Sequence, residues 1–138
     1  MKYIFDTNIC IYLINNKYEY LKTKIENEGI EEIAISTLTI AELEFGIAKS
    51  KSQYKSENRD ALKEFLIPFK FLSFEQKDAY EYAQIRNDLQ SSGNVIGNMD
   101  MLIGAQAKSN GLILVTNKEK EFRRIKDLHI ENWVDSGS

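Results

Sequence analysis

In the stretch YIFDTN at residues 3–8, three apolar residues run directly into Asp6, Thr7 and Asn8. The apolar run predicts a short buried strand. An aspartate after such a strand has two interpretations. It caps a following helix, because Asp, Thr and Asn favour that position, or it is a catalytic carboxylate at the carboxyl end of the strand.

The bulk properties of the chain favour one domain with a buried core. The 138 residues, 43% of them hydrophobic, suit a single domain over residues 1–138. No apolar run approaches the roughly 20 residues of a membrane span. Met1-Lys2 leads straight into the first strand, so no signal peptide is visible. Cys10 is the only cysteine and lies in an apolar stretch, which favours a buried thiol in a cytoplasmic protein.

Composition also limits the chemistry. One histidine and one cysteine exclude a zinc site built from those ligands. The formal net charge of −3 gives no overall indication of nucleic-acid binding. Basic side chains nevertheless gather in residues 49–63 and 118–126, which are either solvated faces or flanks of an acidic site.

Short apolar runs alternate with longer periodic segments along the whole chain. We expect strands near residues 2–5, 33–35, 69–73, 112–115 and 128–130. Helices are expected over residues 9–15, 18–28, 37–49, 54–66, 75–91 and 100–109, with a short helix or turn at 118–124. This alternation predicts an α/β domain with a central, mostly parallel β-sheet flanked by α-helices.

Acidic residues recur where these segments meet one edge of the predicted sheet. Asp6 ends the first strand, and the helix after the second strand carries AELE at 41–44, in which either glutamate could point inward. Asp100 lies on the same helical face as Ile103 and Ala107, so it is expected to point inward as well. The strand LILV at 112–115 is followed by Thr116 and Asn117, and then by Glu119 and Glu121. Four separated segments therefore bring acids to one edge.

Carboxylates that converge without lysine or arginine partners repel one another, and their ionised state requires a cation. Ligation by oxygen atoms alone points to Mg²⁺ or Mn²⁺, which bind a few carboxylates together with water and phosphate oxygens. Such an ion lowers the pKa of a water and neutralises charge on a phosphodiester. The pattern therefore predicts nuclease chemistry without a protein nucleophile.

Four blocks of the chain, in order, resemble VapC-type PIN-domain toxins, the ribonuclease halves of bacterial toxin–antitoxin pairs. They are FDTNICIYLI at 5–14, STLTIAELEFGIAKS at 36–50, IGNMDMLIGAQAKSNGLILVTNKEKEF at 96–122 and DLHIENWV at 127–134. The resemblance implies a PIN-like fold and a Mg²⁺- or Mn²⁺-dependent endoribonuclease that inhibits translation. It also implies RNA, usually tRNA, as substrate, a cognate VapB-like antitoxin and a homodimer.

The resemblance assigns roles to individual positions. The family's first three acids, which would bind the metal, fall on Asp6, Glu42 and Asp100. The fourth falls on Glu121 or Glu119, with Thr116 and Asn117 as polar helpers. This chain has Lys118 where relatives often have Asn or Asp, and GNMD at 97–100 where GPLD is commoner.

The implied reaction is in-line attack of water on phosphorus, which leaves 5′-phosphate and 3′-hydroxyl ends. Lys118, Arg123 and Arg124 could hold the RNA backbone or serve only as surface charge. One rival is an aspartyl-nucleophile phosphatase, which usually needs an acid two residues after the first, where Asn8 stands. The other is a catalytically inactive PIN-like binding module.

Overall fold

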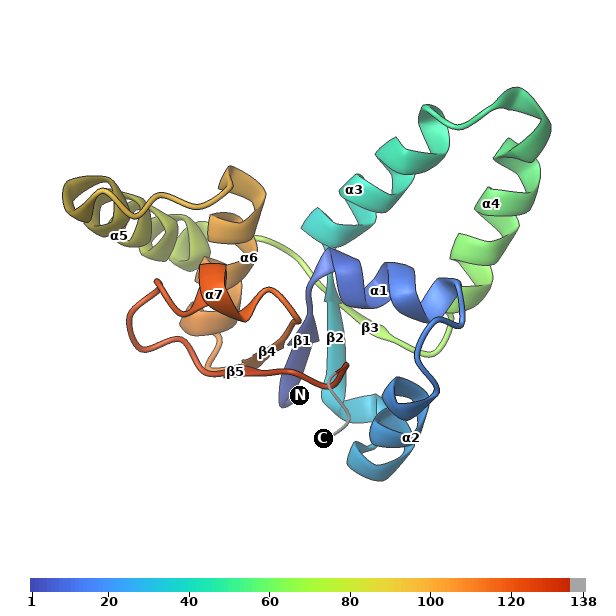
Figure 1. Cartoon of the computed structure of the whole chain (residues 1–138), viewed down its shortest axis with the longest axis horizontal. Coiled ribbons are helices and arrows are strands. Elements are labelled where there is room, and N and C mark those ends of the chain that lie inside the picture. The colour runs from blue at the N-terminus through green and yellow to red at the C-terminus, as the bar shows by residue number, and fades with distance from the viewer. Residues whose placement is uncertain (135–138) are drawn as a thin grey trace.

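The computed structural model describes residues 1–134, so residues 135–138 of the expected 1–138 domain lie outside the described residues. Five strands form one sheet in the order β3-β2-β1-β4-β5, and every neighbouring pair is parallel (Figure 1). The strands are β1 (Tyr3–Phe5), β2 (Ile33–Ser36), β3 (Lys70–Leu72), β4 (Ile113–Val115) and β5 (Ile130–Glu131). The prediction of a mostly parallel sheet is confirmed.

The helices follow the predicted order, and their ends differ from the predicted ones by a few residues at most. They are α1 (Thr7–Ile14), α2 (Glu19–Glu28), α3 (Thr37–Ala48), α4 (Ser52–Leu66), α5 (Gln76–Ser92), α6 (Asn98–Ser109) and α7 (Glu119–Phe122). A 3-10 turn, η1 (Ile30–Glu32), was not predicted. The first helix begins two residues earlier than expected, because Asp6 caps it directly.

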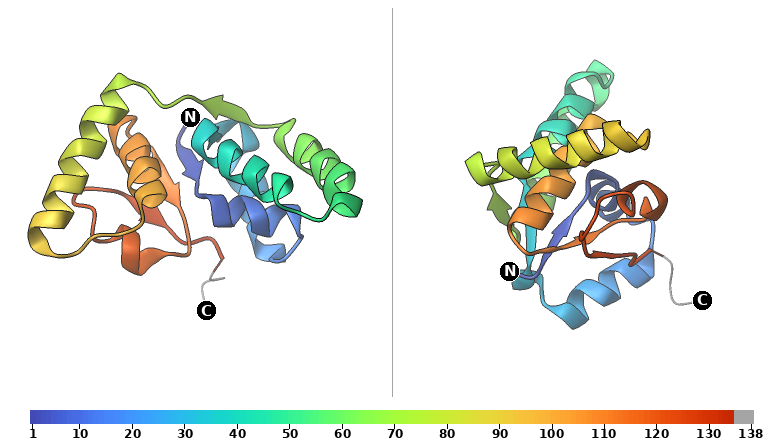
Figure 2. Two further views of the ribbon diagram at one scale, coloured as in Figure 1. Left: turned by 90° about the horizontal axis from the view of Figure 1, so that it is seen from above. Right: turned by 90° about the vertical axis from the view of Figure 1, so that its left-hand side faces the viewer.

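Each face of the sheet is covered by a different set of helices, as side-chain alternation along a strand requires. Tyr3 and Phe5 of β1 pack with residues of α1, α2, α3 and α4, whereas Ile4 between them packs with residues of α5, α6 and α7. Seen from above, α5 and α6 lie on one side of β1, and α1, α3 and α4 lie on the other (Figure 2). Cys10 is buried in the first of these two cores, as expected.

Parallel strands bring their carboxyl ends to one edge, and this edge receives the predicted acids. β1 continues into α1 at Thr7, and β2 continues into α3 at Thr37, with no intervening loop. α6 packs closely against the segment after β4, since a Cβ at Gly104 would lie 2.6 Å from Ile125 Cδ1. Glycine at this position therefore lets α6 carry Asp100 toward the end of β1.

Within residues 1–134, no helix is both long and apolar enough to cross a membrane.

Candidate functional site

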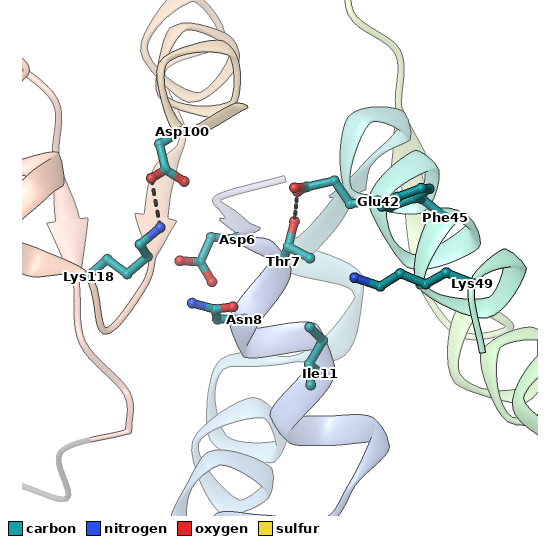
Figure 3. A pocket seen from close by; sticks show the side chains of 10 residues that line it. Asp6, Thr7, Asn8, Ile11, Glu42, Phe45, Lys49, Asp100 and Lys118 are labelled. Carbon is teal, nitrogen blue, oxygen red and sulfur yellow. Dashed lines mark hydrogen bonds and ion pairs between the residues drawn. The ribbon is translucent and has the colours of Figure 1, made fainter. Parts of the chain in front are cut away.

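An open pocket of about 440 Å³ lies at the carboxyl edge of the sheet, where α1, α3 and α6 meet (Figure 3). Three predicted acids line it from three separate elements: Asp6 after β1, Glu42 on α3 and Asp100 on α6. The other lining residues are Thr7, Asn8, Ile11, Phe45, Gly46, Lys49 and Lys118. The expectation that Asp6, Glu42 and Asp100 lie at one edge is therefore met.

Asp6 serves both as a helix cap and as a site carboxylate, so the two interpretations of YIFDTN are compatible. Its Oδ1 accepts a hydrogen bond from the backbone N–H of Ile9 at 2.9 Å, which is the N-cap interaction of α1. Its Oδ2 accepts a hydrogen bond from the Thr116 hydroxyl at 2.5 Å. Only 2% of Asp6 is exposed. The carboxylate is therefore held by β1, α1 and the end of β4 together.

The surroundings of Asp6 disfavour its charge. Burial raises the pKa of Asp6 to about 6, against the hydrogen bonds from Thr116 and Ile9, which lower it. The negative charge of Asp100 raises the pKa further, and the positive charge of Lys118 lowers it. Asp6 and Asp100 are thus close enough to repel each other, as the sequence predicted.

The two glutamates of AELE point in different directions. Glu42 lines the pocket, where its Oε1 accepts a hydrogen bond from the Thr7 hydroxyl (Figure 3). Glu44 instead lies 3.1 Å from Arg59 of α4 in a half-exposed ion pair. The structure therefore resolves an alternative that helical periodicity left open, in favour of the glutamate that the family pattern indicated.

Asp100 is not an unpartnered carboxylate, so the expectation that the acids converge without a lysine or arginine partner is wrong. The Lys118 ammonium lies 2.7 Å from Asp100 Oδ2 (Figure 3). Burial of Lys118 acts to lower its pKa, but the hydrogen bond to Asp100 and the charges of Asp100, Asp6 and Glu121 outweigh it and raise the pKa. The reason lies in the fold, which brings the loop after β4 beside the start of α6.

The polar residues that follow β4 have different partners, and some of them lie away from the pocket. Thr116 is fully buried and holds Asp6, as described above. Asn117 instead donates a hydrogen bond to the Tyr12 hydroxyl of α1 at 3.1 Å. Glu119 accepts hydrogen bonds from Arg123 at 2.8 Å and from Asn132 at 2.9 Å. The charge of Glu121 contributes to the raised pKa of Lys118, and neither Glu119 nor Glu121 is among the residues that line the pocket, so the choice between them stays a prediction.

The other basic candidates have partners within the chain. Arg123 pairs with Glu119, and Arg124 donates a hydrogen bond to the backbone carbonyl of Val95 at 3.3 Å. Both arginines are exposed. Neither lines the pocket, so any contact with RNA would lie outside it.

Two further residues complete the pocket wall: Phe45, which was not predicted, and Lys49, which belongs to the basic run 49–63 that was expected either as a solvated face or as a flank of an acidic site. Phe45 of α3 and Lys49, the residue that caps the C-terminal end of α3, line the pocket, with the Lys49 ammonium 5.2 Å from the centre of the Phe45 ring. These residues follow Glu42 at intervals of three and seven along one helix, which places all three side chains on one face. That spacing could have identified both residues once Glu42 was chosen.

The donor atoms of the pocket suit a hard divalent cation. Asp6, Glu42 and Asp100 offer only oxygen, and burial together with Asp100 makes the charge on Asp6 unfavourable until a cation compensates it. Within residues 1–134, no three acidic, histidine or cysteine side chains converge tightly enough to hold a metal ion by themselves.

Comparison with known proteins places the chain in a family. Residues 3–128 match the PIN domain family. The chain is 40% identical to "Ribonuclease VapC2" of Rickettsia felis, across 96% of this chain and 98% of the relative. It is 34% identical to "tRNA(fMet)-specific endonuclease VapC" of Salmonella typhimurium, across 96% of this chain and 98% of the relative.

Solved structures agree with these matches. The crystal structure of DNA-bound VapBC from Salmonella typhimurium matches with a TM-score of 0.89 and 34% identity, over 96% of this chain and 98% of that chain. VapBC2 from Rickettsia felis, bound to a promoter DNA fragment, matches with a TM-score of 0.88 and 38% identity, over 96% of this chain and 99% of that chain. The chain belongs to the PIN-domain family and, within it, to the VapC group.

Proposed function

We propose that this chain is a VapC-type endoribonuclease toxin that requires Mg²⁺ or Mn²⁺ and hydrolyses phosphodiester bonds of RNA, with tRNA as its substrate class. One observation carries the proposal: Asp6, Glu42 and Asp100 come from three separate elements and line a single pocket. The VapC relatives, which are named either as ribonucleases or as tRNA(fMet)-specific endonucleases, support the same activity.

Each site residue has a role in this proposal. Asp6 and Asp100 would hold the metal ion, and Glu42 would hold it directly or through water. A bound divalent ion supplies charge neutralisation at the phosphate and lowers the pKa of a water. Thr116 fixes the orientation of Asp6 through its hydrogen bond, and Thr7 does the same for Glu42.

Glu121 would orient the attacking water or support a second ion. Water attacks phosphorus in line and the 3′ oxygen leaves, so the products carry 5′-phosphate and 3′-hydroxyl ends. Asn117 would act indirectly, through the hydrogen bond that its side chain donates to the Tyr12 hydroxyl of α1. The exposed Arg123 and Arg124 would contact the RNA backbone by charge neutralisation.

A VapB-type antitoxin is the proposed partner, in a cytoplasmic protein that acts as a homodimer. A second pocket, of about 370 Å³, adjoins the first, and the two share Ile11, Glu42 and Gly46. Apolar side chains of α1, α3 and α4 line it, including Ile14, Leu43 and Leu62. An antitoxin segment with apolar side chains for this groove and an arginine or lysine for the carboxylates would fit both pockets.

An RNA cleavage assay with the purified chain tests the activity. Cleavage is expected with Mg²⁺ or Mn²⁺ and not in EDTA. Asp6→Ala and Asp100→Ala are each expected to reduce the rate at least about 100-fold, because each removes a charged ligand. Normal cleavage by either pure variant would show that the site is wrongly assigned. Undiminished cleavage in EDTA would remove the metal from the proposal, and no cleavage of any RNA would favour the inactive binding module.

Two glutamates of α3 provide a matched comparison. Glu42→Gln is expected to slow cleavage at least about tenfold, whereas Glu44→Gln, which removes only a half-exposed pair with Arg59, should leave it unchanged. Equal effects of the two substitutions would contradict the role given to Glu42. Direct ligation of adaptors to the new ends checks the expected 5′-phosphate, and a 5′-hydroxyl would exclude the proposed hydrolysis.

Control by an antitoxin is tested separately. The chain is expected to co-purify with the product of a small gene next to its own, and the complex should cleave RNA more slowly than the chain alone. A neighbour that neither binds nor inhibits would refute the toxin–antitoxin assignment and leave the nuclease assignment standing.

A further inference from the structure

Lys118 connects the two carboxylates at the centre of the pocket. Its ammonium lies 2.7 Å from Asp100 Oδ2. Its backbone N–H donates at 2.9 Å to the Thr116 hydroxyl oxygen, and that hydroxyl in turn donates to Asp6 Oδ2. The backbone of Lys118 is thus anchored beside Asp6, while its side chain reaches across to α6.

The other lysine of the pocket is placed differently. Lys49 lies on the opposite wall, directly after α3, and its side chain extends into the pocket (Figure 3) with its ammonium 5.2 Å from the centre of the Phe45 ring. Within residues 1–134, the ion pair of Lys118 with Asp100 is the one salt bridge formed by a carboxylate of this pocket. Two cations therefore line the pocket, and one of them directly neutralises an acid.

We propose that Lys118 is an internal counter-ion that competes with the divalent metal ion for Asp100. The inference rests on the proposed function, in which Asp100 is a metal ligand. At 2.7 Å from Oδ2 the ammonium occupies one of the directions in which that oxygen would bind a metal. A divalent ion at the same oxygen would also meet the positive charge of Lys118 at close range, so the ion pair has to open before Asp100 can ligate fully.

The Lys118 ammonium can move away from Asp100. It is 36% exposed, and it is long and flexible, so the ammonium can return to water at small cost. In the metal-free protein the lysine relieves the repulsion between Asp6 and Asp100, and in the metal-bound protein it is displaced toward the pocket mouth. A displaced ammonium there is available for an RNA phosphate, which is how Lys118 would reach the substrate.

Titration of the purified full-length protein with Mn²⁺ alone, followed by calorimetry, tests the competition. Lys118→Met keeps most of the aliphatic stem and removes the charge, and it is expected to tighten Mn²⁺ binding about fivefold or more, the effect of losing one partly exposed competing pair. Lys118→Arg keeps the charge and should bind Mn²⁺ like the wild type. Lys49→Met is the matched control, because it removes a charge from the same pocket that pairs with no site carboxylate, and it should change the affinity less than about twofold.

A second measurement separates competition from a structural role. In EDTA, Lys118→Met should melt at or below the wild-type temperature, whereas saturating Mn²⁺ should raise its melting temperature by more than it raises that of the wild type. If Lys118→Met does not fold, Lys118→Gln takes its place in both measurements. Unchanged or weaker Mn²⁺ binding by the variant would overturn the proposal, and so would an equal gain in Lys49→Met.

These measurements contain no RNA, so their outcome is independent of the proposed activity. Tighter Mn²⁺ binding by Lys118→Met in a protein that cleaves no RNA would support the counter-ion and refute the nuclease. If the protein cleaves RNA and Lys118→Met binds Mn²⁺ with the wild-type affinity, the nuclease assignment is supported and the counter-ion proposal is refuted.

Discussion

Replacing Asp6 by asparagine is expected to stabilise the metal-free protein at neutral pH. The wild-type carboxylate is buried, and its folded-state pKa is about 6 against an ordinary value of 3.8. A carboxyl group with a raised folded-state pKa binds its proton more tightly in the folded state than in the unfolded state. The wild type therefore loses stability as pH rises from about 4 through about 6, and the loss is complete above that range.

The size of the effect follows from these values. The interval from 3.8 to about 6 corresponds to about 3 kcal/mol, at about 1.4 kcal/mol per unit of pKa. Asparagine keeps an oxygen for the N–H of Ile9 but offers only one acceptor oxygen, so the hydrogen bond from Thr116 is weakened at a cost of about 1 kcal/mol. The expected net gain at about pH 8 is about 2 kcal/mol, or roughly 6 °C in Tm.

Thermal unfolding in EDTA at several pH values between about 4 and about 8 measures this. The advantage of Asp6→Asn should shrink as pH falls and vanish near pH 4, where the folded wild type is protonated. Asp78→Asn is the matched control, because Asp78 is equally buried but accepts hydrogen bonds from the backbone of Glu75 and the side chains of Ser109 and Asn110. That variant should be destabilised at neutral pH. An Asp6→Asn variant that is less stable than the wild type at pH 8 would show that the charge of Asp6 does not destabilise the metal-free protein.

Three other substitutions test the packing and the hydrogen bonds around the site. Gly46→Ala on α3 should stabilise the protein by about 0.5–1 kcal/mol, since a Cβ there meets nothing within 4 Å. The free energy of unfolding of Gly104→Ala should be at least about 1 kcal/mol lower than that of Gly46→Ala, because the new Cβ displaces Ile125. Equal urea midpoints for the two alanine variants would contradict the close packing of α6. Thr116→Val should lower the free energy of unfolding by about 1–3 kcal/mol, because it removes the hydrogen bond to Asp6. Since Thr116 lowers the pKa of Asp6, the pH-dependent loss of stability should also move to higher pH in this variant. An unchanged pH profile would show that Thr116 does not act through Asp6.

The amino-acid sequence was enough to predict the order of the strands and helices and the sheet edge at which Asp6 and Asp100 lie. Apolar runs such as YIF at 3–5 and ILV at 113–115 are long enough only for buried strands, and the periodic segments between them predicted the helices. Asp6 was identifiable because a parallel sheet places the carboxyl ends of its strands at one edge. Asp100 was identifiable because its helical spacing to Ile103 and Ala107 places it on the inward face.

The contacts between side chains from distant segments could not be predicted from the sequence and became clear in the folded structure. Periodicity along α3 did not decide between Glu42 and Glu44; the packing of α3 turns the face that carries Glu42 to the pocket, while Glu44 pairs with Arg59 of α4. The pairing of Lys118 with Asp100 joins residues from two elements that meet only when α6 packs beside the loop after β4. Local patterns fix backbone conformation and the inward or outward face of a residue, because these depend on near neighbours in the chain. The direction of a long charged side chain depends instead on charges that the fold brings near from distant segments, and no spacing in the sequence encodes those distances.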